Sequence, residues 1–175
     1  MSDAIEETAV GEPPATAPTR YSAVAATVAA TLVPVALVTA VPLAATVAFV
    51  GIGFVAAGVA LARRRLVTAG FLLQLLAIGL AGWVGGAIPA VLAATVFCVV
   101  AWDLGGYAIE LGAQLGRDAE TLVLEVVHSL ASLGVGVAVA GLGGVVYALV
   151  GGVVPAGGVL ALVVGAALLA SSLRG

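Results

Sequence analysis

Arginines divide this chain into long blocks that carry no charge. Its six basic residues are all arginines, at positions 20, 63–65, 117 and 174. Three blocks between them, residues 22–62, 66–102 and 129–173, contain no charged side chain. A helix needs roughly 20 apolar residues to cross the hydrocarbon core of a bilayer. Each block is therefore long enough for two crossings.

This charge pattern also predicts a topology. If each block folds as a helical hairpin, every arginine, both termini and all nine carboxylates lie on one side of the bilayer. Positive residues mark that side as the cytoplasm. A composition of 63% hydrophobic and 9% charged residues, with a mean hydropathy of +1.28, excludes a soluble domain. We expect an all-α polytopic protein of the cell membrane, with six transmembrane helices in three hairpins and both termini cytoplasmic.

Prolines divide each block into two arms. Pro42, Pro89 and Pro155 lie near the block centres, and proline is favoured in the first turn of a helix. The predicted spans are residues 22–38, 42–61, 66–82, 89–102, 130–150 and 155–173. A shared V-G-G-x-(I/V)-P-A pattern at 84–90 and 150–156 reflects either common turn chemistry or a duplicated hairpin.

Residues 1–20 differ from the rest of the chain. They combine four carboxylates with three prolines and lack large apolar side chains apart from Ile5 and Val10. This composition predicts a disordered acidic cytoplasmic tail before a transmembrane domain over 21–175. The absence of lysine and the acidic excess are typical of proteins from extreme halophiles.

Residues 103–128 are the chemically varied part of the chain. Apolar residues recur there at helical spacing, Gly116 can end a helix and Asp118 can cap the next one. We therefore expect the fourth and fifth spans to continue into the cytoplasm as a helical hairpin. Its polar residues form either a solvated face with local ion pairs or a docking surface for a partner. The candidate partner-binding residues are Glu110, Gln114, Arg117, Asp118, Glu120, Glu125 and His128.

Catalytic and metal-binding signatures are missing from the sequence. Glu125 and His128 have the Glu-x-x-His spacing of di-iron bundles, but His128 is the one histidine, so a subunit lacks the further ligands. We expect a non-enzyme without cofactors and without nucleic-acid partners. A transporter is the competing hypothesis, because Gln74 lies near the centre of the third span. An interhelical hydrogen bond is the other interpretation of Gln74.

Several short segments resemble a known family. Trp102-Asp103, Gly112, residues 116–121 and Glu125-Val-Val-His128 are similar to the shared segment of a haloarchaeal family of small multi-span membrane proteins of unknown function. That resemblance implies genes placed beside MoxR-type ATPases and a membrane partner or scaffold for such a system. It implies no catalytic residues. We therefore expect an integral membrane scaffold that recruits a partner through 103–128; the sequence leaves its oligomeric state open.

Overall fold

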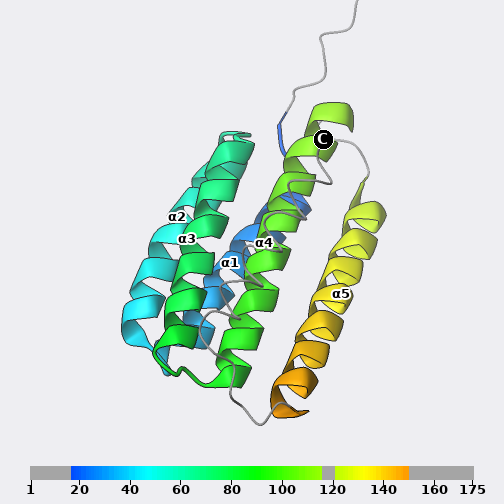
Figure 1. Ribbon diagram of the computed structural model, residues 1–175. Coiled ribbons are helices and arrows are strands. Elements are labelled where there is room, and N and C mark those ends of the chain that lie inside the picture. Colours follow the sequence, from blue (N-terminus) through cyan, green and yellow to red (C-terminus); the bar gives the residue numbers. More distant parts are fainter. Residues whose placement is uncertain (1–16, 116–120, 150–175) are drawn as a thin grey trace, which may run out of the picture.

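The computed structural model describes residues 17–115 and 121–149, and these form five α-helices (Figure 1). The helices are α1 (Arg20–Val38), α2 (Pro42–Ala60), α3 (Arg64–Trp83), α4 (Ile88–Leu115) and α5 (Leu122–Leu149). All five are long and apolar enough to cross a membrane, and the described residues contain no strand. The all-helical class is thus confirmed, and helices of membrane-spanning length lie where the first five spans were predicted. The acidic tail to residue 16 and the sixth predicted span, 155–173, lie outside the described residues.

Successive helices run antiparallel, and α1 to α4 form the packed part of the bundle (Figure 1). Small aliphatic side chains fill its interior, among them Ala30, Val33, Ala48 and Ala77, which are all fully buried. Helix α5 lies mainly against α4, and Glu125 is its single buried residue. Four helices therefore make the core, and α5 is attached to its side.

Glycines let α2 and α3 approach at backbone distance. A Cβ atom added to Gly58 would lie 2.5 Å from the backbone nitrogen of Val67, and one added to Gly70 would lie 2.7 Å from the carbonyl oxygen of Gly51. Small residues at such crossings replace large interlocking side chains in membrane-type helix packing. The glycines of α2 and α3 thus allow a compact helix pair.

The turn after α3 explains part of the V-G-G-x-(I/V)-P-A pattern. Gly85 has φ +82°, and the N–H of Gly86 donates to the carbonyl of Ala81 over 2.8 Å. This is the Schellman arrangement, in which a left-handed residue ends a helix. Pro89 then occupies the first turn of α4. Turn chemistry thus accounts for residues 84–90, while the second copy at 150–156 lies outside the described residues.

Helix α4 continues beyond the predicted fourth span. It runs unbroken to Leu115, so 28 residues give it a length of about 42 Å. The expected extension past Trp102 is confirmed. The predicted cap at Asp118 is wrong for α5, because Thr121 is still non-helical and its carbonyl accepts the N–H of Glu125 over 2.9 Å, as expected of the residue just before a helix. Gly116 and Asp118 themselves lie in the undescribed residues 116–120.

The face of α5 that contacts α4 carries small residues. A Cβ at Gly136 would lie 3.1 Å from Val96, and one at Gly144 would lie 3.3 Å from Leu92. A glycine one helical turn away, Gly141, would meet nothing within 4 Å among the described residues. Gly141 therefore lies off the surface of α5 that contacts α4.

Gln74 supplies the hydrogen-bond donor that α1 lacks at Pro34, in the centre of the bundle. Pro34 lies inside α1 and has no N–H, so the carbonyl of Ala30, four residues earlier, lacks its usual helical donor. The side-chain amide of Gln74 on α3 donates to that carbonyl over 2.9 Å, and Gln74 is fully buried. The predicted interhelical hydrogen bond of Gln74 is confirmed, and it satisfies the acceptor that proline leaves open.

Candidate functional site

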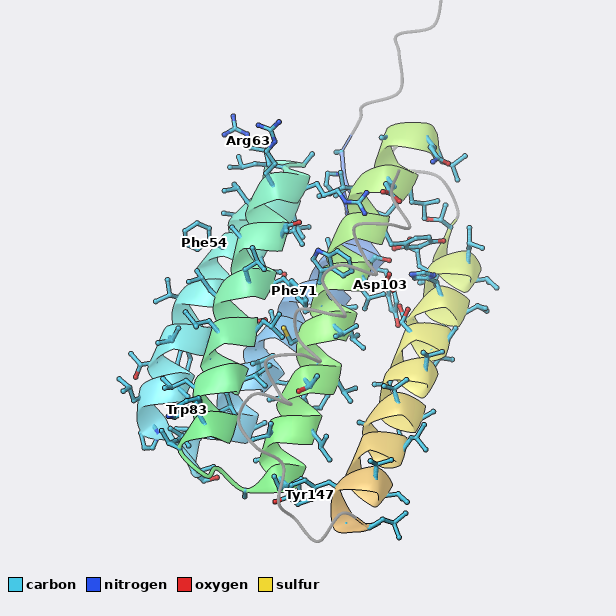
Figure 2. All side chains as sticks on the ribbon, viewed as in Figure 1. Phe54, Arg63, Phe71, Trp83, Asp103 and Tyr147 are labelled. Atoms are coloured by element: carbon cyan, nitrogen blue, oxygen red, sulfur yellow. The ribbon has the colours of Figure 1, made fainter. Side chains whose placement is uncertain are left out.

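The described charged residues gather at one end of the bundle. Arg20 begins α1, Arg63 immediately precedes α3, whose first two residues are Arg64 and Arg65, and Asp103 and Glu110 lie on the second half of α4. Helix α5 begins at this same end because the helices alternate in direction. Figure 2 shows Arg63 and Asp103 towards this end, and Trp83 and Tyr147 towards the other. One polar end and one uncharged end agree with the one-sided pattern of the sequence.

Among the described charged residues at this end, Glu125 is the most buried, with 3% of its surface exposed. Its Oε2 accepts hydrogen bonds from the Thr19 hydroxyl at 2.8 Å, the Ser22 backbone N–H at 2.8 Å and the Ser22 hydroxyl at 2.6 Å. Its Oε1 accepts one from the Thr121 hydroxyl at 2.7 Å. Four donors surround one carboxylate and favour its ionised form.

This network caps the start of α1 from another helix. Thr19 precedes α1 but its own side chain makes no capping hydrogen bond. The carboxylate of Glu125 instead accepts the N–H of Ser22, the third residue of the helix. A negative charge there also interacts favourably with the positive end of the helix. Glu125 therefore ties α5 to α1, two helices that otherwise have few contacts.

A second polar group joins α5 to α4. The Nε2 of His128 lies 2.9 Å from Oδ2 of Asp103, within ion-pair distance, although the ring N–H is not directed at that oxygen. The Ser132 hydroxyl donates to the same Oδ2. The His128 ring stacks on Tyr107 with centroids 3.9 Å apart and planes 13° apart. Polar and ring contacts thus position the first turns of α5.

The end of α4 is braced by the segment before α1. The N–H of Thr19 donates to the carbonyl of Ala108 over 3.1 Å. A Cβ at Gly112 would lie 2.2 Å from the carbonyl oxygen of Ala17, so the two backbones touch there. Only glycine permits this approach. Residues 17–19 therefore lie along the extension of α4.

The candidate partner-binding residues have different environments. Glu110 pairs with Arg64 of α3, and both side chains are about half exposed. Gln114 is exposed near the end of α4. Glu125 and His128 are engaged within the chain, as described above. Arg117, Asp118 and Glu120 lie outside the described residues. Within residues 103–128, the structure thus places Glu125 and His128 in the first turns of α5, in contact with α1 and α4, and Gln114 near the exposed end of α4.

Sequence reasoning missed the partners of Glu125. Thr19, Ser22 and Thr121 are ordinary small polar residues, and no spacing links residues 19–22 to 125. The one available signal was their position beside the ends of predicted helices, where hydroxyl groups serve as caps. Gly112 was part of the family resemblance, but its contact with Ala17 could not be predicted, because Ala17 lies 95 residues earlier in the chain.

The contacts of Glu125, His128 and Gln74 described above hold neighbouring helices together. Several threonine side chains within the helices bond locally. The hydroxyls of Thr27, Thr46 and Thr95 donate to carbonyls of their own helices. In the part of the chain that the structure describes, no group of three or more His, Cys, Asp or Glu side chains could hold a metal ion.

Comparison with protein families identifies the chain. Its sequence matches the profile of a family of unknown function, DUF7519, over residues 16–170. The chain belongs to the DUF7519 family. The matched range includes every described helix and the polar network of Glu125. Comparison with curated proteins and with solved structures gives no significant match.

Proposed function

We propose that this DUF7519 member is a non-catalytic integral membrane scaffold or assembly component that recruits a protein partner through residues 103–128. The proposal includes a sixth crossing over 155–173 and termini on the cytoplasmic side of the cell membrane. One-sided arginines and five membrane-length helices support this topology. The cytoplasmic partner would then meet the charged end of the bundle.

The observation that carries the proposal is the braced end of α4. The backbone contact at Gly112, the hydrogen bond from Thr19 to Ala108 and the ion pair of Glu110 with Arg64 hold this end from two sides. Beyond Gly112, residues 113–115 are exposed, and Leu115 is 51% exposed. A fixed helix end that presents an exposed amide and an exposed leucine is suited to binding another protein, because little conformational entropy is lost on docking.

The resemblance to a haloarchaeal family suggests which class of partner protein binds this surface. It implies genes beside MoxR-type ATPases, so a cytoplasmic ATPase of that type is the proposed partner class. At the high salt of a halophile, charges more than a few ångströms apart are screened. Docking would then rest on short hydrogen bonds and on apolar contacts such as those of Leu115.

A small transporter or channel is the alternative function. It would need polar groups free to meet a substrate near the middle of the bundle. Gln74 is the candidate, because its Oε1 is buried without a hydrogen-bond partner among the described residues. Its amide nitrogen, however, already serves Ala30. This internal role favours the scaffold over the transporter.

Co-purification from native membranes tests the proposal. Leu115→Glu, and separately Glu110→Lys combined with Arg117→Glu, should remove a stoichiometric partner and leave insertion unchanged. Arg65→Gln is the matched control, because it removes an exposed charge at the same end of the bundle but lies outside 103–128 and outside the contacts that brace α4. Two results together would establish the transporter instead. The Leu115 variant and the double variant would both retain every partner, and Gln74→Leu would abolish uptake of a solute.

A further inference from the structure

The turn between α2 and α3 presents three consecutive arginines on a rigid two-helix support. Ala62 has φ +51°, and the N–H of Arg63 donates to the carbonyl of Gly58 over 2.7 Å, which closes the turn as a Schellman motif. A non-glycine residue in the left-handed region is strained and persists where its surroundings fix it. Backbone contact between α2 and α3 at Gly58 and Val67 does so here. The arginines therefore start from a fixed backbone.

The charges at this turn are unequally paired. Arg64 turns towards α4 and pairs with Glu110. Arg63 and Arg65 are exposed, and neither forms an ion pair with any residue in 17–115 or 121–149. Two positive charges thus face outwards on either side of a third that is partly neutralised. The start of α3 has no side-chain cap, and its positive end adds potential of the same sign.

Helix length places this turn at the boundary of the bilayer. Helices α2 and α3 have 19 and 20 residues, or about 28 to 30 Å each, which equals the thickness of the hydrocarbon core. The turn contains no room for a protruding loop, because α3 starts four residues after α2 ends. With α2 and α3 crossing a bilayer, Arg63 and Arg65 would lie at the level of the lipid headgroups. Leu61 beside them is 59% exposed.

We propose that Arg63 and Arg65 form a binding site for the phosphate of an anionic membrane lipid. Guanidinium groups bind phosphate oxygens through paired hydrogen bonds, and exposed Leu61 offers an apolar surface for the adjoining acyl chain. This proposal rests on the proposed membrane location but not on the scaffold function, since the turn lies outside 103–128. Arg64 positions the pair by anchoring the turn to α4.

Native mass spectrometry of the full chain in detergent, titrated with phosphatidylglycerol, tests the site. Near a membrane surface each arginine strengthens binding to anionic lipid by about fivefold, so Arg63→Gln with Arg65→Gln should weaken the first lipid bound by about 25-fold. Arg20→Gln is the matched control at the same end of the bundle and should change that affinity by less than about twofold. Arg63→Lys with Arg65→Lys keeps both charges but loses the paired hydrogen bonds, so its affinity should fall between those of the wild type and the double glutamine variant.

Two further measurements separate the sources of phosphate. Phosphatidylcholine should bind the wild type about as weakly as phosphatidylglycerol binds the double glutamine variant. Inorganic phosphate should displace the anionic lipid only at concentrations far above that of the lipid. Equal binding of both lipids, an Arg20→Gln effect as large as that of the double variant, or displacement by equimolar phosphate would each overturn the lipid site. None of these results would bear on partner co-purification.

Discussion

Pro34 and Gln74 provide the sharpest test of the packing, because the structure predicts that their effects are coupled. Gln74→Leu removes the donor that serves the Ala30 carbonyl and leaves that acceptor buried without a partner. Such a group costs about 1 to 3 kcal/mol, while loss of the unpaired Oε1 of Gln74 offsets part of it. We expect a net loss of about 1 kcal/mol in the free energy of unfolding, near the range of single interhelical hydrogen bonds in membranes.

Pro34→Ala changes this outcome. The new N–H at position 34 can donate to the Ala30 carbonyl as in an uninterrupted helix. In that background Gln74→Leu should cost almost nothing, which gives a coupling energy of about 1 kcal/mol in a double-mutant cycle. The assay is reversible unfolding of the purified chain in mixed micelles titrated with sodium dodecyl sulfate.

The control for this cycle is Thr95→Val, since the Thr95 hydroxyl donates within its own helix. It should show no coupling to Pro34. Additivity of Pro34→Ala and Gln74→Leu to within about 0.5 kcal/mol would refute the reasoning. Gln74 would then have to be retained for another purpose, and the transporter hypothesis would gain support.

Three further predictions concern the polar end and the topology. Glu125→Ala should lower the free energy of unfolding by about 3 to 5 kcal/mol in the same assay, because it leaves several buried donors without an acceptor. Glu125→Gln keeps an acceptor and should cost about half as much. Equal costs of the two variants would contradict the network. Gly112→Ala should destabilise the chain by about 1 to 3 kcal/mol, because the added methyl group overlaps Ala17. Gly79→Ala has open space around it and should stabilise the chain slightly, because alanine favours the helix. The reverse order would contradict the backbone contact between Gly112 and Ala17. In a cysteine-free background, a cysteine at Gly86 should react with an impermeant thiol reagent added to intact cells and one at Arg64 should not, and labelling of Arg64 from outside would exclude the cytoplasmic assignment.

The sequence predicted the helices well because single, strong local signals define them. The lengths of the charge-free blocks predicted how many helices the described region contains. Pro42 predicted the first residue of α2 correctly. Gln74 could be assigned an interhelical bond because an amide among apolar residues needs a partner. Its partner could have been inferred from Pro34, since the carbonyl that a proline exposes lies at a known offset.

The contacts of the polar end could not be predicted in the same way. Glu125 looked like part of a surface stripe, because periodicity describes a helix face but not what covers that face. Its burial depends on the start of α1 lying beside the start of α5, which is a property of the bundle. The α4-facing surface of α5 was missed for a similar reason: glycines occur all round this helix, and only the position of α4 selects Gly136 and Gly144.

The cap of α1 has a consequence for how the chain is made. Glu125 is 103 residues downstream of Ser22, so at about 5 to 20 residues per second the ribosome needs roughly 5 to 20 s to supply the acceptor. During that time the hydroxyls of Thr19 and Ser22 and the N–H of Ser22 lack the protein acceptor that they have in the complete bundle. The fifth helix therefore completes the first. A chain interrupted before residue 125 would expose this unfinished end, and a protease that surveys new membrane proteins could recognise it there.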